Sequence, residues 1–291
     1  MTRILGILVG LFFCFALSVS LFKGIYAYAT DPTAPTAESV FLEHPRELAL
    51  ASDGLTGRFD KRQLQRGLQV YKEVCSACHS LRLVAFRDLT ALGYNEDEVK
   101  AIAKGFQVPG IDPATGETNS RPGLATDYFP KPYANDVAAR AANNNAVPPD
   151  LSLMTKARHE GPAYVYSLLT GYRNQQGYKK DGHDLLKEFP DAKTPPNLHF
   201  NPWFANLNLA MTPPLTAEGQ VGYKDGTKAT VDQMAKDVAA FLVWTAEPKL
   251  DKRKQTGWPV LGFLLFATVL AYLSKKQIWA GKHDAGVTSA V

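Results

Sequence analysis

One five-residue stretch constrains this chain more than any other, Cys75-Ser76-Ala77-Cys78-His79. Two thiols at i and i+3, followed at once by an imidazole, form the attachment signature of c-type haem. One helical turn sets both sulfurs along the edge of a porphyrin, where they add to its vinyl groups as thioethers, and His79 then lies under the iron. With 3 Cys and 6 His in 291 residues, chance gives roughly 6 × 10⁻⁴ occurrences of this pattern.

Two other interpretations of the same residues stay open, a thiol redox pair and half of a zinc site. A zinc site needs further ligands, and the one remaining cysteine, Cys14, stands in an apolar N-terminal run. A thioredoxin-like pair needs a βαβ context, which the sequence around the motif lacks. The pattern therefore favours covalent haem over both.

Composition excludes one broad class of function. The formal net charge of +4 is small for 291 residues, and no basic stripe with interleaved aromatic residues is present, so no nucleic-acid partner is expected. A hydrophobic content of 45% is typical of a globular protein, and a length of 291 residues allows one large domain or two small ones.

The first of two apolar segments runs from Ile4 to Phe22 and is followed by Ala27-Tyr28-Ala29, a small-x-small pattern. This arrangement predicts a secretory signal peptide over residues 1–29 and favours bacterial export. An uncleaved N-terminal anchor is the alternative, because the apolar run is long for a signal peptide.

The second apolar segment, Gly257 to Ser274, has 18 residues without a charge. At ~1.5 Å per residue it spans roughly 27 Å, enough for a thin or locally adapted bilayer. We therefore predict an exported haem domain over 30–254, a transmembrane anchor over 255–276 and a cytoplasmic tail over 277–291.

The exported part is predicted to be mainly α. Periodic apolar positions and capping residues predict four helices, at Asp60–Val74, Asn95–Lys104, Gly161–Tyr172 and Thr230–Thr245. The stretches 108–149 and 173–202 are rich in Pro, Gly and Asn and are expected to be long ordered loops. Strand signals are weak throughout.

A second axial ligand to the iron is sought among the methionines. Met234 falls on the apolar face of a predicted helix and is expected in the core, whereas Met154 has no neighbouring constraint. Met211 precedes Pro213 and Pro214, which hold the backbone extended and could present the thioether at a fixed distance. An ordinary packed loop methionine remains the alternative for Met211. Met/His ligation would favour electron transfer at a relatively high reduction potential.

Other polar residues give weaker signals. Arg121 is a candidate counter-charge to a haem propionate, although a solvated arginine fits the sequence equally well. Surface or hydrogen-bonded roles are expected for the remaining histidines, namely His44, His159, His183, His199 and His283.

Beyond the haem motif, several segments match one known family. They are RGLQVY at 66–71, RPG at 121–123, DYFPKPY at 127–133, AARAANN at 138–144, PPDLS at 148–152, ARH at 157–159, YVYSLLTGY at 164–172, FNP at 200–202, AMTPP at 210–214 and WTAEP at 244–248. Together with the haem motif and the C-terminal apolar segment, they resemble the cytochrome c1 family. This family supplies the haem-bearing subunit of the ubiquinol–cytochrome c reductase (cytochrome bc1) complex. The loop from Arg173 to Leu198 departs from the pattern.

The resemblance implies a fold and a set of ligands. The fold is a class I cytochrome c-like haem domain, mainly α, with long loop insertions and one C-terminal transmembrane helix. One haem c would be bound covalently by Cys75 and Cys78, with His79 and Met211 as the two axial ligands of the iron.

The resemblance also implies a less specific set of pocket residues. Arg121 would face a haem propionate, and Tyr128 and Pro149 would line the pocket.

The function implied is single-electron transfer from the Rieske iron–sulfur protein to cytochrome c. The chain would be an electron carrier within a dimeric complex that also contains cytochrome b, and the enzymatic activity would belong to that complex. Its location would be the bacterial inner membrane, with the haem domain in the periplasm. A stand-alone membrane-anchored cytochrome c is the alternative function.

Overall fold

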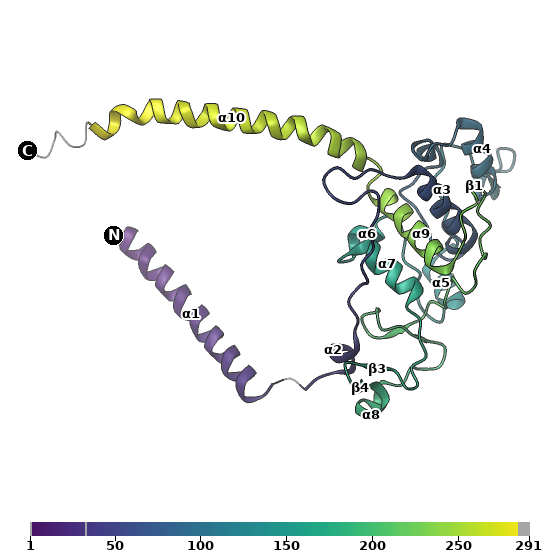
Figure 1. Ribbon diagram of the computed structural model, residues 1–291, viewed down its shortest axis with the longest axis horizontal. Coiled ribbons are helices and arrows are strands. Elements are labelled where there is room, and N and C mark those ends of the chain that lie inside the picture. Colours follow the sequence, from purple (N-terminus) through teal and green to yellow (C-terminus); the bar gives the residue numbers. More distant parts are fainter. Residues whose placement is uncertain (1, 33, 285–291) are drawn as a thin grey trace, which may run out of the picture. The chain divides into compact units, whose positions relative to one another are not determined.

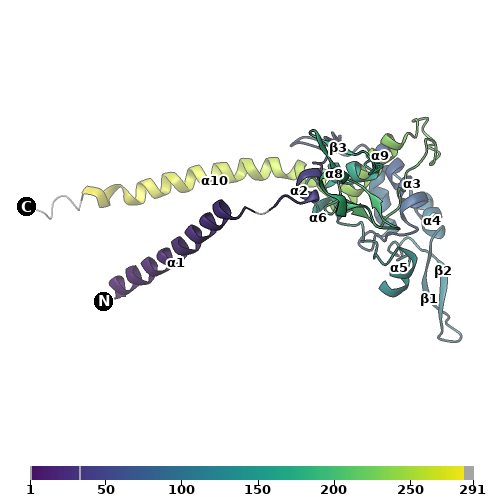
Figure 2. The same ribbon diagram turned by 90° about the horizontal axis from the view of Figure 1, so that it is seen from below.

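The computed structural model describes residues 2–32 and 34–284, which are mostly helical (Figures 1 and 2). They form two compact units, one made of the residues up to Leu42 with Gln175–Lys193, the other of Glu43–Asn174 with the residues from Thr194 onward. The predicted mainly-α fold is confirmed. The part of the predicted tail beyond residue 284 lies outside the described residues.

The first unit contains one long helix and several short elements. They are α1 (Thr2–Thr30), α2 (Ala37–Phe41), β3 (Lys179–Lys180), β4 (His183–Asp184), α8 (Leu185–Glu188) and η3 (Pro190–Ala192). Phe41 is fully buried between the rings of Tyr178 and Phe189, at centroid distances of 6.2 and 6.1 Å. These elements show that the prediction of a plain loop over 173–202 was wrong. Short strands and single helical turns of this kind contain too few residues to show a periodic pattern of apolar residues in the sequence.

The second unit holds the remaining elements. They are α3 (Lys61–Val70), η1 (Tyr71–Cys75), η2 (Phe86–Leu92), α4 (Glu96–Lys104), β1 (Gln107–Ile111), β2 (Thr118–Pro122), α5 (Asp136–Ala142), α6 (Met154–Ala157), α7 (Gly161–Thr170), β5 (His199–Phe200), β6 (Asn208–Leu209), α9 (Val231–Ala246) and α10 (Leu250–Asp284). The four predicted helices are confirmed as α3 with η1, α4, α7 and α9.

Capping side chains explain where these helices begin. The carboxylate of Asp60 accepts hydrogen bonds from the first-turn amides of α3, and the side chain of Asn95 does the same for α4. Thr230 Oγ1 accepts from Gln233 N at 3.0 Å, which is one half of a capping box for α9. The other half is replaced, since Thr230 N donates to Lys228 O at 3.0 Å and Gln233 Nε2 donates to Asp237 Oδ1, one turn further along α9.

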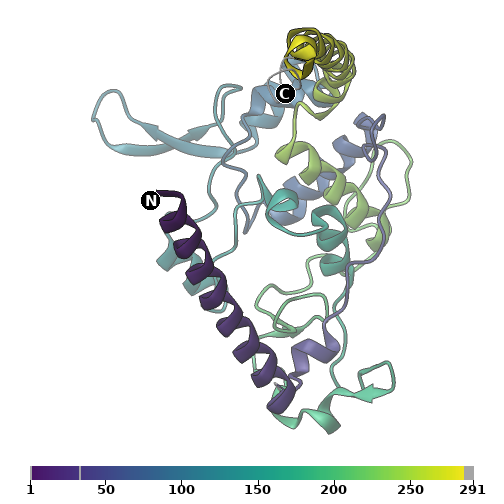
Figure 3. The same cartoon turned by 90° about the vertical axis from the view of Figure 1, so that its left-hand side faces the viewer.

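The core of the second unit is built where α3 and α7 pack against α9 (Figures 1 and 3). The contact between α3 and α9 is so close that a Cβ on Gly67 would lie 2.1 Å from Asp237 O and 2.5 Å from Phe241 Cβ. Glycine is therefore required at position 67, although it costs about 1 kcal/mol of helix propensity relative to alanine.

A buried ion pair joins the same two helices. Asp237 is fully buried in α9, and Arg66 Nε donates to its Oδ2 at 2.8 Å while Arg66 Nη2 donates to its Oδ1 at 3.2 Å. Arg66 also pairs with Asp225. Because an unpaired buried carboxylate is very costly, these bonds disfavour other registers of α3 on α9.

The stretch 108–149 corrects a second sequence prediction. It contains an antiparallel hairpin, β1 with β2, that pairs Gln107 with Pro122 and Ile111 with Thr118, and it also contains α5. Figure 2 shows the hairpin projecting from the helices of its own unit. Only Val108 among its strand residues is buried, so the sequence of the hairpin lacks the alternation of apolar and polar residues that predicts a strand.

In the part of the chain that the structure describes, two helices are long and apolar enough to cross a membrane, α1 and α10. The apolar segment expected at the C-terminal end is thus helical. This helix begins at Leu250, so only residues 247–249 separate α10 from α9.

We expect Gly67→Ala to lower the free energy of unfolding by about 2 kcal/mol or more, since overpacking of a tight contact costs up to ~3 kcal/mol and outweighs the gain in helix propensity. Denaturant unfolding of the full-length protein measures the effect. Gly222→Ala is the control, because its added Cβ would meet no atom within 4 Å. Equal stability of the two variants would contradict the close crossing.

Candidate functional site

The motif Cys75–His79 begins at the end of the π-helical turn η1. Ser76 N donates to Tyr71 O at 2.8 Å, and both Cys78 N and His79 N then donate to Cys75 O, at 3.1 and 2.9 Å. This tight turn keeps the two thiols and the imidazole within one turn of backbone. Cys75 and Cys78 are both free and half-buried. Their role as thioether attachment points for a haem stays a prediction.

The imidazole of His79 is oriented by a backbone carbonyl. Its Nδ1 lies 2.8 Å from Pro149 O, and because a carbonyl can only accept, Nδ1 carries the proton and Nε2 keeps its lone pair for a metal. Burial lowers the pKa of His79, which favours the neutral, ligating form. Pro149 was expected only as a residue lining the pocket, and no sequence pattern predicted this hydrogen bond.

Asp150 ties the chain after His79 to the segment that carries Pro149. Its carboxylate accepts from Ser80 Oγ at 2.7 Å, Arg82 N at 2.9 Å and Ser152 N at 3.0 Å. Burial acts to raise the pKa of Asp150, but these hydrogen bonds outweigh it and hold the pKa below its usual range. Asp150 therefore stays ionised and fixes Pro149 against His79.

Tyr71 supports the motif from the core side. Its hydroxyl donates to His79 O at 2.9 Å, and its ring packs against Phe129 and Phe241 at centroid distances of 5.6 and 6.0 Å. Burial raises the pKa of Tyr71, so the hydroxyl stays a donor. His79 is thus held through its ring by Pro149 and through its backbone by Tyr71.

The surroundings of the thiols do not suit a redox-active pair. Burial, with a further contribution from Cys78, raises the pKa of Cys75 to about 12, whereas reactive thiols have lowered values. Tyr133 Oη approaches Cys78 Sγ at 3.7 Å. Within residues 2–32 and 34–284, no group of three or more His, Cys, Asp or Glu side chains is placed to hold a metal ion, so a zinc site gains no support.

Met211 follows β6 in a loop that is attached to the end of α7. Tyr172 Oη donates to Met211 O at 2.9 Å, and the Tyr172 ring also contacts the ring of His199. Met211 is half-buried. Met154 is half-buried at the start of α6, and Met234 is fully buried in α9, as expected for a core residue.

Arg121 lies on β2 and is engaged by a neighbouring carboxylate. Its Nη1 and Nη2 donate to the two oxygens of Asp127, at 2.6 and 2.9 Å, and this pairing lowers the pKa of Asp127. Tyr128 pairs its backbone with Ala85 and leaves half of its side chain exposed. Among the described residues, no hydrogen bond or ring contact joins Met211, Arg121 or Tyr128 to the motif, so their predicted roles stay predictions.

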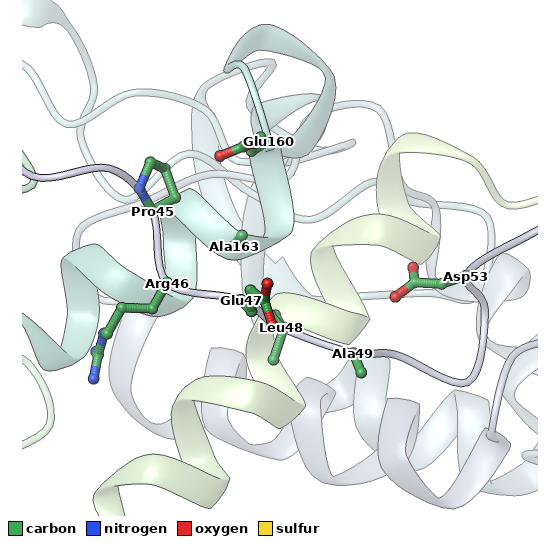
Figure 4. A pocket seen from close by; sticks show the side chains of 8 residues that line it. All are labelled: Pro45, Arg46, Glu47, Leu48, Ala49, Asp53, Glu160 and Ala163. Atoms are coloured by element: carbon green, nitrogen blue, oxygen red, sulfur yellow. The ribbon is translucent and has the colours of Figure 1, made fainter.

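A separate pocket of about 410 Å³ lies between the segment 45–53 and the start of α7 (Figure 4). Its lining includes Glu47, Asp53 and Glu160 and none of the predicted site residues. Arg46 contributes to its wall, and its guanidinium lies over the rings of Tyr166 and Trp203 at 4.7 and 5.1 Å. These contacts are those of a packed structural side chain.

Comparisons with known proteins identify the family to which the chain is similar. A sequence model described as the Cytochrome C1 family matches residues 50–282. The chain is 45% identical over 234 residues to a protein named cytochrome c1 from Rhodospirillum rubrum, covering 78% of this chain and 84% of that one. It is 41% identical over 259 residues to "Cytochrome c1, heme protein, mitochondrial" of Saccharomyces cerevisiae, covering 88% and 79%. It is also 42% identical over 246 residues to "Cytochrome b/c1" of Bradyrhizobium diazoefficiens, covering 79% of this chain and 35% of that longer one.

We expect Asp150→Asn to lower stability at pH 7 by about 2 kcal/mol, because it weakens hydrogen bonds to a charged acceptor. The lowered folded-state pKa means that Asp150 stabilises the wild type above its unfolded value of about 4, and that this contribution is lost as pH falls through the folded-state value. The variant should therefore lose less stability than the wild type between neutral and acid pH. Unfolding curves at several pH values test this, with the exposed Asp191→Asn as control, and parallel curves for wild type and Asp150→Asn would contradict it.

Proposed function

Because this chain belongs to the cytochrome c1 family, we propose that it is a membrane-anchored single-electron carrier with one covalently bound haem c. The observation that carries the proposal is the placement of His79, whose Nδ1–H is fixed by Pro149 O beside two half-buried thiols on one turn. This arrangement prepares one imidazole nitrogen for iron and two sulfurs for thioether bonds.

The residues present fit such a haem. Cys75 and Cys78 would hold it, and His79 and Met211 would be the axial ligands. When bound, the haem supplies a one-electron iron couple. The chain keeps the His79 imidazole neutral by burial, orients it through Pro149 and holds its backbone through Tyr71. No general acid, base or nucleophile is needed for electron transfer.

Arg121 and Tyr128 remain the proposed outer part of the site. Arg121 would face a haem propionate with its guanidinium already oriented by Asp127, which leaves the fork in a fixed plane. Tyr128 follows Asp127 directly in the chain, so the same ion pair positions its backbone.

The proposed electron donor is the Rieske iron–sulfur protein and the proposed acceptor is a cytochrome c. The chain would act with cytochrome b in a dimeric ubiquinol–cytochrome c reductase, and the oxidoreductase activity would belong to that assembly. Membership of the family supports this role, as does the similarity to a relative named "Cytochrome b/c1".

The proposed location is the bacterial inner membrane, with the haem domain (30–254) in the periplasm. Helix α10 would supply the anchor over 255–276 and a cytoplasmic tail from 277, and α1 would contain the export signal of residues 1–29 or an uncleaved second anchor. The length and hydropathy of α1 and α10 support these assignments.

We expect the purified chain to keep its haem through denaturing electrophoresis and to show a reduced-minus-oxidised spectrum typical of c-type haem. Replacement of both Cys75 and Cys78 by serine should abolish the haem stain, while Cys14→Ser should leave it unchanged. Mild detergent extraction should recover the chain with a b-type cytochrome and a Rieske protein. Loss of the stain in the wild type would refute covalent haem, and recovery of the haem protein alone would favour a stand-alone cytochrome.

We expect Met211→Leu to lower the reduction potential by on the order of 0.1 V, within the ~0.8 V range that axial ligands span, because the iron loses its thioether ligand. The open position should then bind carbon monoxide. Met154→Leu is the matched control, since it exchanges a half-buried methionine of the same unit and should change neither property. An unchanged potential in Met211→Leu would show that another residue is the second ligand.

A further inference from the structure

At the junction between the proposed haem domain and α10, the side chain of one lysine is hydrogen-bonded through all of its donors. Lys254, in the second turn of α10, donates to three backbone carbonyls of one loop, Ser52 O at 2.6 Å, Gly54 O at 2.6 Å and Gly57 O at 3.2 Å. An ammonium group has three donors, so all of them are engaged. Figure 1 shows this dark blue loop beside the start of α10.

The loop is shaped to present these carbonyls. The two ends of the loop are joined by a hydrogen bond, which Arg58 N donates to Ala51 O at 2.9 Å. Asp53 holds one side, since its Oδ2 accepts from Leu50 N at 2.7 Å. Gly54 adopts a φ of +67°, and a Cβ on Gly57 would lie 1.9 Å from Asp53 O. Both glycines are therefore required by a backbone that turns its oxygens toward one point.

A second hydrogen bond connects α10 to the same segment. Asp251 Oδ1, one turn before Lys254, accepts from Phe59 N at 3.1 Å. The next residue, Asp60, caps α3, and α3 leads directly into Cys75. The first turns of the proposed anchor are thus bonded to the chain that begins the haem-bearing helix.

We propose that Lys254 is a positioning residue that fixes the haem domain in one orientation on its membrane helix. The inference rests on the proposed function, because it assumes haem on Cys75 and Cys78 and a membrane-spanning α10. Lys254 lies three residues before Gly257, where the apolar part of α10 begins, so the lysine site holds the haem domain at the edge of the membrane. Without such a site, relative motion of a domain on its tether is the default.

The test is Lys254→Met in the full-length haem-loaded chain, reconstituted in oriented lipid bilayers, with linear dichroism of the haem absorption as the readout. Methionine keeps an unbranched side chain but removes all three hydrogen bonds. We expect the dichroic signal to fall by about twofold, because the domain reorients once the junction is released. The haem spectrum and reduction potential should not change, which separates a positioning role from damage to the site.

Lys252→Met is the matched control. Lys252 lies on the same helix, is exposed, and has no hydrogen bond or ion pair among the described residues, so its loss should leave the dichroism at the wild-type value. If Lys254→Met does not accumulate, Lys254→Gln, which keeps two donors on a shorter stem, should give a smaller fall.

The outcomes separate the two proposals. A wild-type chain without covalent haem would refute the proposed function itself. A wild-type chain with oriented haem, together with wild-type dichroism in the Lys254 variant, would refute only the positioning role of Lys254.

Discussion

The close crossing of α3 over α9 is the contact on which the rest of the second unit depends. It is possible because Gly67 has no side chain to keep the backbone of Asp237 away, and it is held in register by the buried pair of Arg66 with Asp237. Since α3 continues through η1 into the Cys75–His79 motif and α9 leads within three residues to α10, this one crossing joins the proposed redox centre to the proposed anchor. A change of register there would displace both.

The motif itself becomes a defined site only when distant parts of the chain close on it. Pro149, 70 residues after His79, fixes the ring, and Tyr71 fixes the backbone from the core. Asp150 then joins the two segments. Its carboxylate accepts hydrogen bonds from Ser80 and Arg82, which follow His79, and from Ser152, which follows Pro149. The same principle operates at the junction with α10, where Lys254 reaches back 202 residues to Ser52. Rigidity here comes from a few satisfied polar contacts placed around an apolar core.

The sequence predicted the four main helices because periodicity and capping are local signals. Asp60, Asn95 and Thr230 all cap the helices that they were expected to begin. The hairpin of β1 and β2 was missed because its strands are short, mostly exposed and bury only Val108. The capping box of α9 formed only by half, because the backbone N–H of Thr230 donates to Lys228 O instead of to the Gln233 side chain.

The sequence by itself determined the chemistry: two thiols and an imidazole at the spacing of haem attachment, a helix to carry them, and an apolar segment long enough for a bilayer. The tertiary structure decided which carbonyl orients His79, why position 67 must be glycine, and where the ammonium of Lys254 is bound. The physical reason is the separation along the chain of the residues that make contact. Spacing and periodicity are set within a few residues, whereas these contacts join residues 70 to 202 positions apart and exist only once the core has closed.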